Sequence, residues 1–272
     1  MGDFISDRAS YDSSIQVKNK KIKFIQTMLL FFLLSPTSGH SAEQLYEQMV
    51  GEATGLQSGQ SLYEEVHCGA VNELASDVYY QSSDGALIAH KTLDYGSGRS
   101  TPSFVQTYAS NQEKVKVKLD QGSLMMSITA RNGEESNRQY QLSALGETPV
   151  VIDAGFDVFI RDNWQKLMSG NIKYFQFPLV SRAQLISSRV KKSLCQYETN
   201  TDQCFALEPS NWLFRMLASP IELGYDSTLM RLNRYRGLSN INDDNGDSLV
   251  VDIKYQYKET EVTCAFVKVD NI

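Results

Sequence analysis

The chain has 272 residues, with 26 Lys and Arg residues against 32 Asp and Glu residues, and a formal net charge of -6. A hydrophobic share of 42% and only 6 prolines are typical of a folded globular protein and exclude a disordered one. The acidic balance also argues against a general nucleic-acid binder, which normally carries a basic stripe.

The first predicted element is a secretory signal peptide within residues 1–42, with its core at 17–42. A cluster of lysines precedes the apolar segment 24–34, and small residues follow as far as Ala42. This order is typical of a signal peptide. As a helix the segment spans about 16 Å, well short of a bilayer core of ~30 Å. We therefore predict cleavage after Ala42, a periplasmic location and no stable membrane anchor; an uncleaved N-terminal anchor is the alternative.

The mature chain is predicted to be a single β-rich domain over 43–272. Residues 42–55 predict a short amphipathic helix, because Leu45, Met49 and Ala53 are spaced four residues apart. From Leu62 onward, apolar and polar residues alternate between turns rich in Gly, Asn and Asp, which predicts strands. The predicted strands include 79–81, 86–93, 104–108, 115–119, 124–128 and 249–257. Because each has one apolar and one polar face, we expect an antiparallel sheet.

Two helices interrupt the strands. Apolar residues from Phe156 to Leu167 recur at helical spacing, with Asp153 as a candidate N-cap and Gly170 as a natural stop. Residues 210–217 predict a second, short helix between two prolines. The predicted fold is therefore mainly β, a β-rich α+β domain with a curved antiparallel sheet or open half-barrel covered by one or two helices.

Four cysteines lie in the part predicted to be exported: Cys68, Cys195, Cys204 and Cys264. An even number in an oxidising compartment predicts disulfides, although four cysteines allow three ways of pairing. Cys195 and Cys204 flank a polar stretch that resembles a hairpin loop, and we favour this pair. Cys68 and Cys264 would then join the chain ends. A thiolate metal site is the alternative, but the sequence has no C-x-x-C knuckle.

The sequence contains no recognisable catalytic constellation. It lacks a G-x-S-x-G motif, and only His67 and His90 are available as a base for a serine nucleophile. The glycine-rich segment 96–101 lacks the lysine of a phosphate loop, and segment 242–247 has the wrong register for a calcium loop. We expect no catalytic residue, no metal and no cofactor, with an undetected hydrolase as a further alternative.

The most unusual feature is aromatic. Residues 172–179 predict a strand that is apolar on both faces, so it is either buried on both faces or lines a cavity. Aromatic residues nearby in the sequence belong to the two predicted helices. The candidate walls of an apolar pocket are therefore Phe159, Trp164, Phe175, Phe177 and Trp212. The alternative is an ordinary core between helix and sheet.

Residues 155–178, with GFDVFIRDNWQKLMSG at their start, and residues 225–255, containing RLNRYRGLSNINDDNG, resemble an uncharacterised family of exported proteins from Gram-negative proteobacteria. That resemblance implies export and supplies no catalytic residue. At the level of fold, the chain also resembles the open half-barrels of periplasmic lipoprotein carriers of the LolA and LolB type, which hold acyl chains inside a curved sheet. No motif matches the carriers, so no binding residue is carried over.

These observations favour a non-enzymatic function. We expect the protein to bind a lipid, another apolar ligand or an envelope component in the concavity of the sheet. The alternative is a protein–protein accessory factor of the envelope that uses exposed sheet edges and has no cavity. We expect no nucleic-acid partner.

Overall fold

The computed structural model describes residues 46–70, 74, 76–111, 113–199, 202–217, 219–243 and 245–260. All of them belong to one compact unit, Ala42–Ile272. The predicted signal peptide and Cys264 lie outside the described residues.

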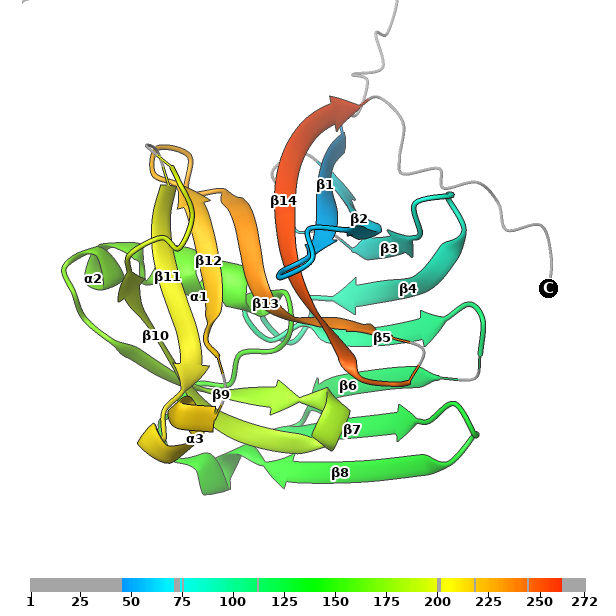
Figure 1. Ribbon diagram of the computed structural model, residues 1–272. Coiled ribbons are helices and arrows are strands. Elements are labelled where there is room, and N and C mark those ends of the chain that lie inside the picture. The colour runs from blue at the N-terminus through cyan, green and yellow to red at the C-terminus, as the bar shows by residue number, and fades with distance from the viewer. Residues whose placement is uncertain are drawn as a thin grey trace, which may run out of the picture. The chain divides into compact units, whose positions relative to one another are not determined.

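The described strands form one antiparallel sheet of 14 strands, in the order β8-β7-β6-β5-β4-β3-β2-β1-β14-β13-β12-β11-β10-β9 (Figure 1). The first and last strands of the chain therefore pair at the centre of the sheet, and strands β8 and β9, from the middle of the chain, form its two edges. The strands are β1 (Tyr46–Gly55), β2 (Ser61–Ala70), β3 (Asp77–Gln81), β4 (Leu87–Asp94), β5 (Ser103–Tyr108), β6 (Lys114–Asp120), β7 (Ser123–Thr129), β8 (Glu135–Gln141), β9 (Lys173–Leu179), β10 (Gln184–Ser193), β11 (Asp202–Pro209), β12 (Ile221–Asp226), β13 (Leu232–Asn242) and β14 (Ser248–Thr260).

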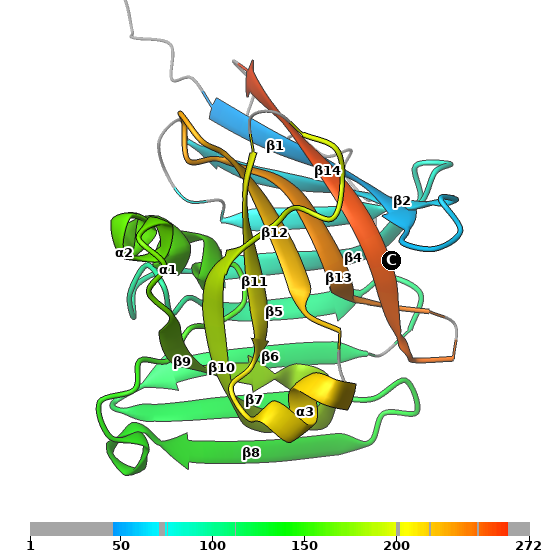
Figure 2. The same ribbon diagram turned by 60° about the vertical axis from the view of Figure 1, so that its left-hand side comes forward.

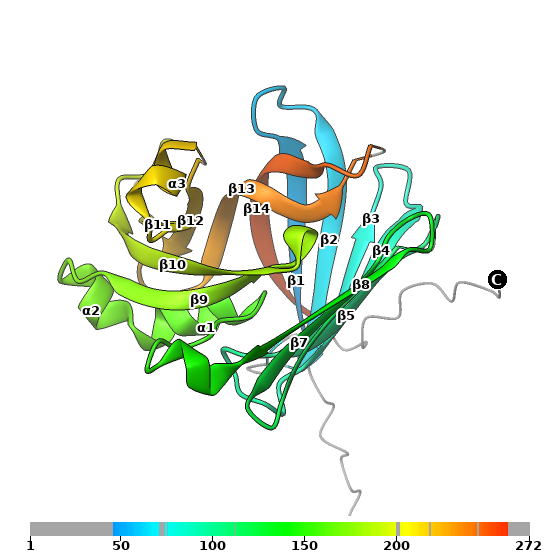
Figure 3. The same ribbon diagram turned by 90° about the horizontal axis from the view of Figure 1, so that it is seen from below.

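The sheet is bent into two walls, β1–β8 and β9–β12, which are joined through β13 and β14 (Figure 3). Its edges come close to each other, since the Tyr140 hydroxyl on β8 donates to the carbonyl of Ala183, between β9 and β10, at 3.2 Å. The segment after β8 also reaches β9, through a parallel bridge between Val150 and Gln176. The predicted curved, open antiparallel sheet is thus confirmed.

Five short helical segments accompany the sheet in the described residues. They are η1 (Leu142–Leu145), α1 (Gly155–Asp162), α2 (Trp164–Met168), η2 (Val180–Arg182) and α3 (Trp212–Leu217). Helix α1 begins at a glycine because a Cβ on Gly155 would overlap the Ser100 carbonyl oxygen. The backbone N–H of Ile152 donates to that same oxygen, which holds the start of α1 close to the turn before β5.

Two hydrophobic clusters fill the inner face of the sheet. The first lies over β1–β8 and includes Tyr80, Leu124 and Met126. The second lies between helices α1 and α2 and strands β9–β13, and includes Trp164 and Phe205. Burial of such side chains contributes about 1.5–3 kcal/mol each relative to exposure, which makes these clusters the main source of stability.

The predicted helix at 42–55 is wrong where the structure describes it, because residues 46–55 form strand β1. Met49 and Ala53 are four residues apart, a spacing that places two side chains on one face of a helix and also on one face of a strand. β1 hydrogen-bonds to β14 on one side and to β2 on the other. This pairing along both edges outweighs the weak local preference for a helix.

The predicted helix over 156–167 is present but interrupted, because α1 ends at Asp162 and α2 begins at Trp164. Asp153 is not its N-cap: Ala154 occupies that position, and Asp153 has a left-handed backbone, with φ of 44°. The side chain of Asp153 pairs instead with Lys91 on β4. The predicted strands of β3–β7, β9 and β14 and the short helix α3 are confirmed, with small differences at their ends.

Candidate functional site

The predicted aromatic walls divide into two groups. Phe159, Trp164, Phe175 and Phe177 belong to the second cluster, where the rings of Phe159 and Phe175 lie 5.1 Å apart and those of Phe175 and Phe177 lie 6.3 Å apart. Trp164 is wedged against Phe205, at 5.2 Å between ring centroids. These rings contact one another and are buried or half-buried, so they form packed core.

Trp212, which was predicted as a wall of the same pocket, does not join this cluster. Trp212 lies on α3, which follows β11 and contacts Glu208 through Arg215. The exposed fraction of Trp212 is 65%. Side chains alternate along β11, so Glu208 faces away from the cluster that contains Phe205 and Leu207. Helix α3 is therefore on the outer side of the sheet.

A small cavity of about 30 Å³ lies on the inner face, with Lys91, Asp153, Gln106 and Asn240 among its lining residues. That volume accommodates one or two water molecules. Lys91 donates to both oxygens of Asp153, at 2.8 and 2.9 Å. The lysine nitrogen is thus engaged in an ion pair with this carboxylate on the inner face.

A second polar group surrounds Glu65. The Tyr255 hydroxyl donates to the Glu65 carboxylate at 2.5 Å, and Nε2 of His67 lies 3.0 Å from the same oxygen. Burial, and next the Glu65 carboxylate, raise the pKa of Tyr255 well above its usual range. The tyrosine is therefore a neutral hydrogen-bond donor and is unsuited to act as a base at neutral pH.

The histidines considered for catalysis are each paired with a carboxylate. His90 lies 2.9 Å from Asp77 and stacks on Tyr79, with 4.5 Å between ring centroids. Among the described residues, no serine is hydrogen-bonded to His67 or His90, so within them neither histidine has the geometry of a base beside a serine nucleophile. Among the described residues, no group of three or more His, Cys, Asp and Glu side chains is placed to hold a metal ion.

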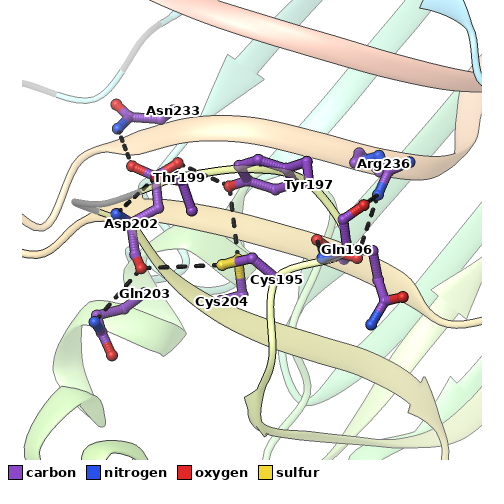
Figure 4. Close-up of a disulfide and its surroundings, with 10 residues drawn as sticks. Cys195, Gln196, Tyr197, Thr199, Asp202, Gln203, Cys204, Asn233 and Arg236 are labelled. Carbon is purple, nitrogen blue, oxygen red and sulfur yellow. Dashed lines mark hydrogen bonds and ion pairs between the residues drawn. A yellow bond between two sulfur atoms is a disulfide. The ribbon is translucent and has the colours of Figure 1, made fainter.

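The loop between β10 and β11 is fastened to the outer face of the sheet (Figure 4). Cys195 and Cys204 form a disulfide, with 5.2 Å between their Cα atoms. Cys68 is also disulfide-bonded, and Cys264, its predicted partner, lies outside the described residues. Disulfides indicate an oxidising compartment.

Tyr197, at the centre of this loop, lies flat on the sheet. Its hydroxyl donates to Asp202 at 2.8 Å, and the guanidinium of Arg234 stacks 4.1 Å from its ring centroid. The ring occupies the space above Gly224, where a Cβ would overlap the tyrosine oxygen. The glycine therefore leaves room for the tyrosine and the loop that carries it.

Helix α3 has the opposite polarity to an ordinary surface helix. Four of its large apolar side chains are half or more exposed: Trp212 65%, Leu213 50%, Phe214 55% and Met216 73%. Its one charged residue, Arg215, turns back to the protein, where it donates to the carbonyls of Pro209, at 3.2 Å, and Ser210. A surface helix normally buries its apolar stripe and exposes its charges.

Local interactions account for the formation of α3. The side chain of Asn211 accepts a hydrogen bond from the backbone N–H of Leu213 at 2.9 Å, which is a standard N-cap. Pro209 and Pro220 stand on either side of the helix and restrict its length. The exposed apolar side chains are thus held on a helix that is capped at its start and anchored by Arg215.

A cluster of positive charge lies beneath α3. The Glu208 carboxylate is contacted by Arg189 at 2.5 Å, Lys191 at 3.1 Å and Arg215 at 3.9 Å. Burial alone would raise the pKa of Glu208, but the hydrogen bonds from Arg189 and Lys191 outweigh it and lower that pKa. With three cations around one carboxylate, this part of an acidic protein has an excess of positive charge.

The sequence predicts this helix and places Trp212 in the wall of a pocket, whereas in the structure Trp212 is on the outer surface. The signal that identifies it is the composition WLFRML, in which a single arginine stands among large apolar residues. Whether the arginine or the apolar residues face water depends on Glu208 and the carbonyls at the end of β11, which are brought to Arg215 by the tertiary structure.

Among the described residues, none of the helices combines the length and the apolar character needed to cross a bilayer.

Comparison with known proteins does not identify a function for this chain. No family model matches the chain, and no curated protein matches it. A solved structure from Brucella abortus, described as a beta-barrel-like protein of domain of unknown function DUF1849, is similar over 80% of this chain and 99% of its own, with 8% sequence identity and a TM-score of 0.41. The resemblances to an exported proteobacterial family and to the LolA and LolB carriers stay predictions.

Proposed function

We propose that the protein is a non-enzymatic binding protein of the cell envelope, which docks on an envelope component through α3. The observation that carries this proposal is the polarity of α3, whose apolar side chains face water while Arg215 is turned inward. Exposed clusters of large apolar residues are uncommon on proteins that have no partner and mark interaction surfaces. Tryptophan, in particular, is enriched where partners bind.

Two further observations support this assignment. The predicted signal peptide and the disulfide between Cys195 and Cys204 favour the periplasm. On the inner face, Trp164 and Phe175 are packed against their neighbours, and the cavity beside Lys91 holds only about 30 Å³. At these described residues the inner face offers packed side chains, whereas α3 offers exposed ones, which favours α3 as the binding surface.

The proposal is tested by sedimentation of the purified mature protein with envelope fragments from the cells that produce it. We expect the wild-type protein to sediment with the fragments. Leu213→Gln combined with Phe214→Gln should weaken binding roughly 10- to 100-fold. Full burial of such a side chain contributes about 1.5–3 kcal/mol, and about half of each side chain is exposed and available for burial on binding. The two together therefore contribute about 1.5–3 kcal/mol, and 1.4 kcal/mol corresponds to a factor of ten.

A matched control is available in the turn between β12 and β13. Leu229 is 65% exposed, as Trp212 is, but it lies outside α3. We expect Leu229→Gln to bind like the wild-type protein, and circular dichroism should show the same spectrum for every variant. If the double variant on α3 binds as well as the wild-type protein does, the docking role of α3 is wrong.

A further inference from the structure

We infer that the surface on which α3 docks is a lipid surface with anionic headgroups. This inference rests on the proposed function, and it names the chemistry of the partner. It is drawn from three features of the outer face: the exposed side chains of α3, the position of this helix at the end of β11, and the cations around Glu208.

The shape of the α3 surface suits a lipid boundary. Figure 2 shows α3 at the end of strand β11, which leads directly into it. An apolar group that is exposed in this way needs a matching pocket on a protein partner, whereas the boundary between headgroups and acyl chains adapts to it. Peripheral proteins use Trp, Phe and Leu side chains on a helix in this manner, and tryptophan is enriched at membrane interfaces.

The charge beside α3 suits anionic headgroups. Arg189, Lys191 and Arg215 surround the single carboxylate of Glu208, so two positive charges beside α3 are not balanced within this cluster. Lys191 is the most exposed of the three, at 38% of its side chain. Long basic side chains next to an apolar surface extend their charged ends to the headgroup region. Apolar insertion and cationic contact would therefore occur side by side.

The overall negative charge of the protein limits which part of its surface can approach anionic headgroups. With a formal net charge of -6, the chain as a whole is repelled by an anionic surface. Attraction must therefore come from the local cluster beneath α3, within a Debye length of about 8 Å at physiological ionic strength. We expect binding to need both parts: the apolar side chains supply insertion, and the cations select anionic headgroups.

The test uses vesicles of phosphatidylcholine alone and of equal parts phosphatidylcholine and phosphatidylglycerol. The chain has 2 tryptophans, and Trp164 is buried in the core, so a shift of tryptophan emission to shorter wavelength on adding vesicles reports Trp212. We expect this shift, together with co-sedimentation, only with the anionic vesicles. Trp212→Phe should abolish the shift while leaving most of the sedimentation.

Two variants separate the contributions. Lys191→Gln should weaken binding to anionic vesicles roughly fivefold, since each basic residue near an anionic surface contributes about 1 kcal/mol. High salt should weaken the wild-type protein by a similar or larger factor. Leu213→Gln with Phe214→Gln should abolish vesicle binding, and Leu229→Gln should leave it unchanged.

The outcomes distinguish this inference from the function on which it rests. Equal binding to both kinds of vesicle would overturn the role of the cations. Binding to envelope fragments with none to either vesicle would overturn the lipid surface and point to a protein partner on α3, while the docking function stands. Absence of binding to fragments and to vesicles alike would overturn both.

Discussion

Removal of one charge from the buried pair of Lys91 and Asp153 is predicted to be among the most damaging conservative changes in the protein. The Lys91 side chain is 3% exposed and donates to both oxygens of Asp153. Its ammonium also lies 5.2 Å from the ring centroid of Phe104. Asp153→Asn keeps the size of the side chain and tolerates the left-handed backbone at this position, so it isolates the effect of charge.

The magnitude follows from the burial of the pair. Breaking a buried ion pair by neutralising one partner costs about 3–5 kcal/mol, because the remaining charge is left without compensation in a medium of low dielectric constant. We expect a loss of about 3 kcal/mol, at the lower end of that range, since the amide oxygen of the substituted side chain still accepts one hydrogen bond from Lys91. In the double variant Lys91→Met with Asp153→Asn, most of the loss should be recovered, because no buried charge remains.

The assay is equilibrium unfolding in urea, with the midpoint and slope determined for each variant. The control is Asp120→Asn, because Lys118 and Asp120 form an ion pair of 3.0 Å on the outer face with both side chains nearly half exposed. Exposed pairs contribute between about 0 and 1 kcal/mol. If Asp153→Asn and Asp120→Asn lose the same stability, or if the double variant is less stable than Asp153→Asn, the reasoning from burial is refuted.

Three further predictions concern the core, the outer face and acid. Trp164→Ala should lose about 3–5 kcal/mol in urea unfolding, whereas Trp212→Ala should change stability by less than about 0.5 kcal/mol; similar losses would contradict the assignment of core and surface. Gly224→Ala should cost about 1–3 kcal/mol by displacing Tyr197, and the cost should largely vanish in a Tyr197→Ala background. Because the pKa of Glu208 is lowered in the folded protein, its contribution to stability is complete above its unfolded pKa of about 4.3 and is lost as the pH falls through the folded value. The loss of stability measured below pH ~4.3 should therefore be smaller in Glu208→Gln than in the wild-type protein. An equal pH dependence in both proteins would contradict this role of Glu208.

Several features of the fold and of the candidate site can be predicted from the sequence alone. The alternation of Val115, Val117 and Leu119 with three lysines identifies a strand with one solvent-exposed face. Successive side chains point to opposite sides of a strand, and this does not depend on which strands it pairs with. The short helix between Pro209 and Pro220 is also predictable, since proline restricts helices locally. The polar stretch between Cys195 and Cys204 likewise indicated the loop that their disulfide closes.

Other features depended on residues that are distant in the chain. β1 is a strand because β14 and β2 supply hydrogen bonds along both its edges, and the spacing of Met49 and Ala53 suits a helix equally well. Asp153 is bound by Lys91, which lies 62 positions before it, and therefore does not cap the helix that it precedes. No local pattern records which partner such a side chain finds.

The class of the fold can be predicted from the sequence, because hydrophobic alternation and turn residues act within a few positions of one another. The different environments of the two tryptophans, in contrast, depend on contacts between distant parts of the chain. Both lie on short helices rich in apolar residues, yet α2 lies against β11 and β12, where Trp164 meets Phe205 and Tyr225, while Arg215 ties α3 to the outer side of β11 and leaves Trp212 in water. Which face of a sheet a helix covers depends on the path of the whole chain, and burial follows from that path.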